Sequence, residues 1–142
     1  MPEAAQDRVH IFTCGTCIDT THGGEAGLGA GAALSAAIRK RVDEEPYKDR
    51  LVAKDVRCLM ACTEGCTLSI GQSGKFKYLL GRLTDDPHLI EQVLDFAVMY
   101  GASEMGVVPN HEWPPLLATH IIARIPPVTP RDPDWSDEGA HL

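Results

Sequence analysis

The sequence predicts an α/β domain in which a mixed β-sheet carries packed helices. The chain has 142 residues, enough for one domain with its own apolar core. Hydrophobic residues make up 44% of it and charged residues 23%, which is typical of an ordinary globular protein. The apolar pattern switches along the chain between period two and period four, so strands and helices are both expected.

The first half of the chain predicts a strand, a helix and a second strand. Residues 8–13 alternate between apolar and polar side chains, which favours a short strand. The Ala-rich stretch from Glu25 to about Glu45 repeats apolar residues every fourth position, which favours a helix that ends before Pro46. Residues 51–58 predict the second strand.

A hairpin and a second long helix are expected next. Two short runs, 67–70 and 75–80, flank the turn sequence Gly-Gln-Ser-Gly and predict the hairpin. Apolar residues at helical spacing predict a helix over 87–102, with Asp85 or Asp86 as its N-cap. A strand–helix–strand unit forms a right-handed parallel crossover, and the hairpin adds antiparallel strands, so the arrangement is thioredoxin-like.

The last quarter of the chain differs in composition. Beyond residue 106 seven prolines cluster, at positions 109, 114, 115, 126, 127, 130 and 133. We therefore expect two parts: a thioredoxin-like domain over 1–105, and an extended Pro-rich tail over 106–142 packed on it. One short helix is expected near Leu116 to Ile121, and the polar end from Pro130 on is expected to be disordered.

Charge and targeting signals narrow the class of function. The net charge of -7 disfavours binding to nucleic acid or to anionic membrane lipids. No apolar run is long enough to span a bilayer, and residues 1–7 are acidic, unlike a signal peptide. We therefore expect a cytoplasmic protein, in which thiols stay reduced and clustered cysteines indicate metal or redox chemistry.

All five cysteines lie in two short segments, each directly after a predicted strand. Cys14 and Cys17 form a C-x-x-C motif, and Cys58, Cys62 and Cys66 form C-x-x-x-C-x-x-x-C. Structural cysteines scatter through cores, whereas two thiolates per iron from two loops would bind a [2Fe–2S] cluster. This clustering is the strongest functional signal in the sequence.

The second segment resembles a ligand loop of a known superfamily. Val-Arg-Cys-Leu-Met-Ala-Cys-Thr-Glu-Gly, over residues 56–65, is similar to the second ligand loop of the thioredoxin-like [2Fe–2S] ferredoxins and of the small iron–sulfur subunit of respiratory NADH dehydrogenases. The resemblance covers about residues 8–102. It implies four cluster ligands: Cys14, Cys17, Cys58 and Cys62.

The whole chain is still more similar to a bacterial family of unknown function, usually labelled putative metal-binding. The shared features are the two cysteine segments, a Gly-Lys-x-x-Tyr-Leu stretch at 74–79 and Ala-Arg-Ile-Pro-Pro at 123–127. Members often sit beside genes for cobalt and cobalamin handling, which implies a partner in that chemistry.

Two departures from the ferredoxin pattern concern the ligands. The first cysteine pair is closer together than in the ferredoxins, and Cys66 stands where they commonly carry proline. Cys66 is therefore a possible alternate ligand, or a residue beside the ligands.

Three other readings of the cysteines remain open. Four of them could bind zinc tetrahedrally. Cys14 and Cys17 could instead form a thiol–disulfide oxidoreductase motif, although the predicted helix begins too late to activate either thiol. All five could also be inert.

The expected function is that of a one-electron carrier rather than an enzyme. Acidic side chains near the cysteines, Asp19, Glu25 and Glu64, would attract a basic redox partner protein. His22 lies close in sequence and is expected to be an exposed loop residue. The resemblance to the ferredoxins also implies a possible homodimer.

Overall fold

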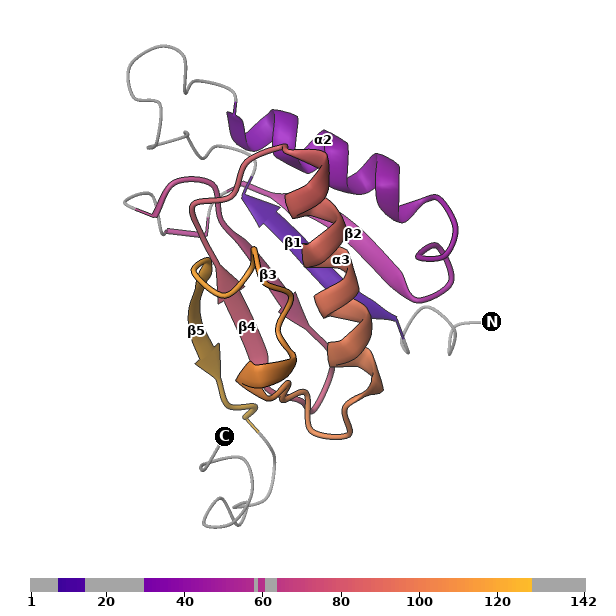
Figure 1. Cartoon of the computed structure of the whole chain (residues 1–142), viewed down its shortest axis with the longest axis vertical. Coiled ribbons are helices and arrows are strands. Elements are labelled where there is room, and N and C mark those ends of the chain that lie inside the picture. Colours follow the sequence, from indigo (N-terminus) through magenta and orange to yellow (C-terminus); the bar gives the residue numbers. More distant parts are fainter. Residues whose placement is uncertain (1–7, 15–29, 58, 61–63, 129–142) are drawn as a thin grey trace.

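The computed structural model describes residues 8–14, 30–57, 59–60 and 64–128 (Figure 1). They form one five-stranded mixed sheet of order β2-β1-β3-β4-β5 with two long helices. The predicted α/β class with a mixed sheet and flanking helices is confirmed. The strands and helices are β1 (Val9–Cys14), α2 (Ala30–Val42), β2 (Leu51–Val56), β3 (Leu68–Gly71), β4 (Lys77–Leu80), α3 (Pro87–Ala102) and β5 (Ile121–Ile125).

Strand β1 is an interior strand of the sheet and joins its parallel part to its antiparallel part. It runs parallel to β2 in unbroken register from Val9 opposite Leu51 to Cys14 opposite Val56. On its other side it pairs antiparallel with β3, and β3 continues through the predicted hairpin to β4. The parallel crossover and the antiparallel hairpin both follow the sequence prediction.

The two helices lie side by side on one face of the sheet (Figure 1). The guanidinium of Arg41 on α2 donates to the carboxylate of Glu91 on α3, with a Nε–Oε2 distance of 2.7 Å. Tyr47, just after α2, donates its hydroxyl to Asp95 on α3 at 2.6 Å. Burial and this hydrogen bond raise the pKa of Tyr47, which keeps the phenol protonated and the contact intact.

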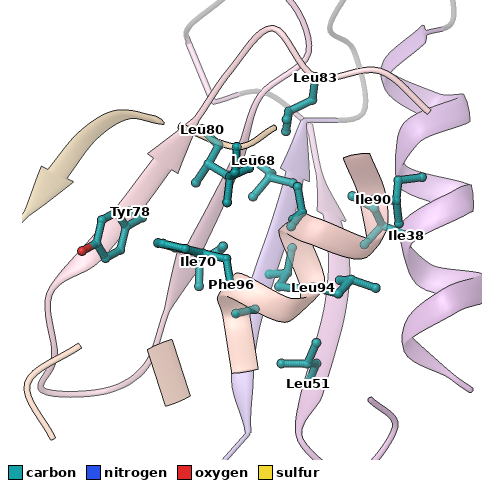
Figure 2. Close-up of a cluster of buried hydrophobic side chains, with 14 of the residues drawn as sticks. Ile38, Leu51, Leu68, Ile70, Tyr78, Leu80, Leu83, Ile90, Leu94 and Phe96 are labelled. Carbon is teal, nitrogen blue, oxygen red and sulfur yellow. The ribbon is translucent and has the colours of Figure 1, made fainter. Parts of the chain in front are cut away.

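The core fills the space between the helices and the sheet (Figure 2). Side chains from every described layer meet there, as Figure 2 shows for Ile38 of α2, Leu94 of α3 and Ile70 of β3. Tyr78 packs edge-on against Phe96, with ring centroids 4.9 Å apart. These side chains are almost completely buried, so the apolar faces of the helices and strands are removed from water on this side of the sheet.

The predicted helix over 87–102 is confirmed at both ends by α3. The carboxylate of Asp86 accepts a hydrogen bond from the backbone N–H of His88 at 2.9 Å, so Asp86 is the N-cap. Pro87 occupies the first turn, where its missing N–H costs nothing. Of the predicted first helix, the described part ends at Val42, before Pro46, and residues 25–29 lie outside the described residues.

The segment after residue 106 is more ordered in structure than the sequence predicts. The backbone of Val108 is fixed to the core, since its N–H donates to the Tyr78 hydroxyl and its carbonyl accepts from the Trp113 indole. The short helix expected near Leu116 to Ile121 is wrong, because residues 115–120 form turns and Ile121 begins β5. Strand β5 pairs antiparallel with β4 and was not anticipated. The end expected to be disordered, from Pro130 on, lies wholly outside the described residues.

Two glycines with positive φ, one in the β3–β4 turn and one after α3, allow a matched test of packing. At Gly106, with φ +75°, a Cβ would lie 2.8 Å from both Lys75 Cβ and Tyr100 Cε2, whereas at Gly74, with φ +78°, nothing lies within 4 Å. Each alanine substitution lowers the unfolding free energy by about 1 kcal/mol, because a residue with a Cβ is unfavourable in the left-handed backbone conformation. Gly106→Ala should cost about 1–3 kcal/mol more, because it overpacks the core. Urea unfolding midpoints measure the difference, and equal losses would contradict this account.

Tyr100 predicts an alkaline loss of stability. Its hydroxyl donates to the Phe76 carbonyl, and burial raises its pKa to about 12, against about 10 in an unfolded chain. The contribution is therefore fully present below pH 10 and is lost as the pH rises toward 12, by up to about 1.4 kcal/mol per pH unit. Tyr100→Phe should make the unfolding free energy less dependent on pH between about pH 10 and pH 12. An unchanged slope in denaturant titrations would argue against it.

Candidate metal centre

Cys14 lies at the carboxyl end of β1, beside the strand that leads to the second cysteine segment. It is the last residue of β1 and pairs in register with Val56, the last residue of β2. Because the two strands are parallel neighbours, their carboxyl ends lie at one edge of the sheet, about 4.8 Å apart. Cys58 follows Val56 by two positions. The first and second cysteine segments therefore begin at adjacent points.

Cys66 is held near the same edge by backbone hydrogen bonds. The N–H of Cys14 donates to the carbonyl of Thr67 at 3.1 Å, and the N–H of Leu83 donates to the carbonyl of Cys66 at 3.1 Å. Cys14 and Cys66 are 2% and 1% exposed. Two of the five cysteines thus occupy buried positions that one backbone hydrogen bond brings close together.

The other predicted ligands lie outside the described residues. These are Cys17, Cys58 and Cys62; the predicted loop histidine His22 lies there as well. Over the ranges that the structure describes, no group of three histidine, cysteine or acidic side chains could hold a metal ion. The structure therefore brings together the points at which the cysteine segments begin, and the ligand set stays a prediction.

The segment that carries Cys66 is fixed by residues that sequence reasoning did not single out. Arg82 adopts φ 54°, and its N–H donates to the Glu64 carbonyl at 2.6 Å. Its guanidinium also donates to the Thr119 carbonyl, at 2.6 Å, and to the Glu64 carboxylate, at 3.4 Å. Arg82 therefore joins the cysteine segment to the turn before β5. The partial neutralisation of Glu64 also weakens the role predicted for it in attracting a basic partner.

Gly81 allows these segments to approach closely. A Cβ there would lie 2.4 Å from Ile122 Cδ1 and 3.2 Å from the Glu64 carbonyl oxygen. Its N–H donates to the His120 carbonyl at 2.8 Å, and its own carbonyl lies 2.9 Å from His120 Nδ1. His120 thus positions the backbone near the site. The Gly-Arg pair directly after a predicted strand was the signal in the sequence that could have indicated this close approach.

Two described residues of the second cysteine segment adopt left-handed backbone conformations. Met60, between Cys58 and Cys62, adopts φ 59° and is 87% exposed, while Gly65 adopts φ 70°. Leu59, the residue before Met60, packs against the core.

The acidic side chains predicted to attract a partner are only partly described. Asp19 and Glu25 lie outside the described residues. Asp55, near the end of β2, forms an ion pair with Arg39 of α2 at 3.7 Å, and both side chains are about half exposed. Such an exposed pair contributes little to stability. Of the three predicted acids only Glu64 is described, and it is paired with Arg82.

Fold and site together define a class: a small α/β domain whose cysteine segments start from adjacent carboxyl ends of a mixed sheet. The chain belongs to the family described as protein of unknown function (DUF1636), whose model matches residues 11–127. No curated protein and no solved structure matches it. The predicted likeness to an uncharacterised family is thus confirmed. In the part of the chain that is described, the helices are too short or too polar to cross a membrane.

The contact that holds the end of β1 to α2 can be tested. The Thr13 hydroxyl donates to the Ser35 hydroxyl at 2.8 Å, and both residues are fully buried. Thr13→Val leaves the Ser35 hydroxyl without this partner and should cost about 1–3 kcal/mol of unfolding free energy. The double variant Thr13→Val/Ser35→Ala removes both polar groups and should be more stable than the single one. A double variant at least as unstable as the sum of both single changes would contradict the assignment.

Proposed function

We propose that this protein binds one [2Fe–2S] cluster through Cys14, Cys17, Cys58 and Cys62 and serves as a one-electron carrier. The observation that carries the proposal is the register of the two parallel strands. Cys14 lies opposite Val56, so the C-x-x-C motif and the segment that begins at Cys58 leave the sheet side by side.

The donor set suits the cluster. A [2Fe–2S] cluster needs two thiolates for each iron, and each segment supplies a closely spaced cysteine pair. The bound cluster would supply one-electron oxidation and reduction, while the chain would position it and set its potential. Burial of Cys14 near the core lowers the local dielectric, which helps to determine that potential.

The topology supports the same class. The order strand, helix, strand, hairpin and helix, with β1 between β2 and β3, supports the proposed likeness to the thioredoxin-like ferredoxins. The thioredoxin-like ferredoxins, which the loop over 56–65 resembles, also bear their ligand pairs after the first and second strands. This likeness favours an electron carrier over a structural zinc protein.

Burial weakens the competing thiol–disulfide oxidoreductase. An attacking cysteine must be partially exposed to reach a disulfide substrate, and Cys14 is only 2% exposed. A buried thiol at the end of a strand is better suited to bind a metal cluster than to attack an external substrate.

Cys66 is the natural control among the cysteines. It is buried and anchored through its carbonyl, and the ligand set implied by the resemblance does not include it. Because Cys66 lies next to Cys14 in the fold, Cys66→Ser changes a neighbouring thiol without removing a proposed ligand.

Anaerobic purification followed by iron, acid-labile sulfide and zinc analysis tests the proposal. We expect about two irons and two sulfides per chain, visible absorption, and a paramagnetic signal after one-electron reduction. Serine variants of the four proposed ligands, one at a time, should lose most of the cluster, whereas Cys66→Ser should keep it.

Two results would overturn the proposal. A colourless protein with one zinc per chain would identify a zinc protein. A metal-free protein that reduces a disulfide substrate would identify a thiol oxidoreductase. Equal loss of iron in Cys66→Ser and Cys62→Ser would instead change the ligand set.

A further inference from the structure

The sheet has a second face that neither described helix covers. Both α2 and α3 lie on one face of the sheet (Figure 1). Ile11 and Ile70 are buried in the core on that face, so the alternate residues of the strands point to the second face. On that face His10 and Phe12 of β1 are only partly buried, and Lys77 of β4 is exposed.

A groove of about 590 Å³ crosses this open face. Its floor comes from β1 and β3, and its walls come from the β3–β4 turn and from the residues that follow β5. The His10 and Phe12 rings lie stacked, with centroids 6.0 Å apart. The Lys77 stem lies over Gly71, where an added Cβ would come 3.2 Å from Lys77 Cγ.

The groove has a charge opposite to that of the whole chain. The chain carries 20 acidic residues against 13 lysines and arginines, yet no acidic residue lines the groove. Two lysines, Lys75 and Lys77, line the groove. The ammonium of Lys75 donates to the Gly101 carbonyl at 3.2 Å, so Lys77 is the lysine whose charge is available to an occupant of the groove. An occupant with acidic and aromatic side chains would match these walls.

The chain itself enters this groove. Ile125, Pro126, Pro127 and Val128 line it, and Val128 is fully exposed at the point where residues 129–142 begin. Those residues contain four acids, Asp132, Asp134, Asp137 and Glu138, against the single Arg131, and they carry the aromatic Trp135.

The length of the chain beyond Val128 and the spacing of its prolines also suit this groove. From β5 to β1 the groove crosses three strand spacings, roughly 14 Å. Trp135 lies seven positions beyond Val128, which allows a reach of up to roughly 24 Å. Pro127, Pro130 and Pro133 recur every third residue, a spacing that favours an extended polyproline II segment with little entropy to lose on docking.

We propose that residues 129–142 occupy the groove on the open face of the sheet, with their carboxylates beside Lys77 and Trp135 against Phe12. The groove is thus an intramolecular docking site for an acidic, aromatic segment. This inference is independent of the metal bound by the cysteines.

Photo-cross-linking in the full-length chain tests the docking directly. Trp135→p-benzoylphenylalanine places the probe, and mass spectrometry identifies the residues it attaches to. We expect a product of monomer mass with attachment within residues 10–12 or 69–77. Lys77→Glu should lower its yield at least about threefold, as should neutralising the four acids to Asn and Gln, because both remove the charge attraction.

Lys40→Glu is the matched control, because it makes the same charge change at an exposed position on α2. It should leave the yield unchanged. A product of dimer mass would assign the groove to a second copy of the chain and overturn the proposal. Attachment outside the groove, or a yield that is insensitive to Lys77→Glu, would overturn it as well.

Discussion

The parallel pairing of β1 with β2 is the constraint on which the rest of the structure depends. Its register runs without a break from Val9 opposite Leu51 to Cys14 opposite Val56. A slip of one residue would turn every side chain of β1 to the opposite face and expose Ile11. The register is therefore fixed by core packing, and the same register determines where the two cysteine segments leave the sheet. Fold stability and the geometry of the candidate centre are consequences of one set of contacts.

Local signals allowed most of the fold to be predicted. The bounds of α3 follow from Asp86, Pro87 and an apolar stripe, which act within a few residues of one another. Strand β5 could not be found in this way. Its sequence, Ile-Ile-Ala-Arg-Ile, shows no regular alternation, and its partner β4 lies 40 or more residues away in a register that shifts at Leu79 and Leu80. Pairing with the distant strand β4 determines the structure of this region, although its prolines predict an extended tail.

The candidate centre was predictable in its residue types and not in its supports. The clustering of cysteines after two strands predicts the site, and its ligand set stays a prediction because Cys17, Cys58 and Cys62 lie outside the described residues. The supports act through backbone geometry, which single-sequence patterns do not encode. Arg82 holds the Glu64 carbonyl from a left-handed conformation, and His120 reaches Gly81 across 39 residues. Such roles become visible only once the strands are in place.

The two faces of the sheet are linked through β1 itself. Thr13 points to α2, since its hydroxyl bonds Ser35, so alternation places Cys14 on the open face together with Phe12 and His10. Cys14 is nevertheless buried, while Phe12 and His10 are only partly so. The open face is therefore already covered at the cysteine end and exposed at the groove end. An acidic segment in the groove would cover the exposed part of this face. It would also place negative charge near Lys77, on the same face of the sheet as Cys14. Occupation of the groove would then favour the oxidised state of a cluster at the end of β1, because nearby negative charge makes the addition of an electron less favourable.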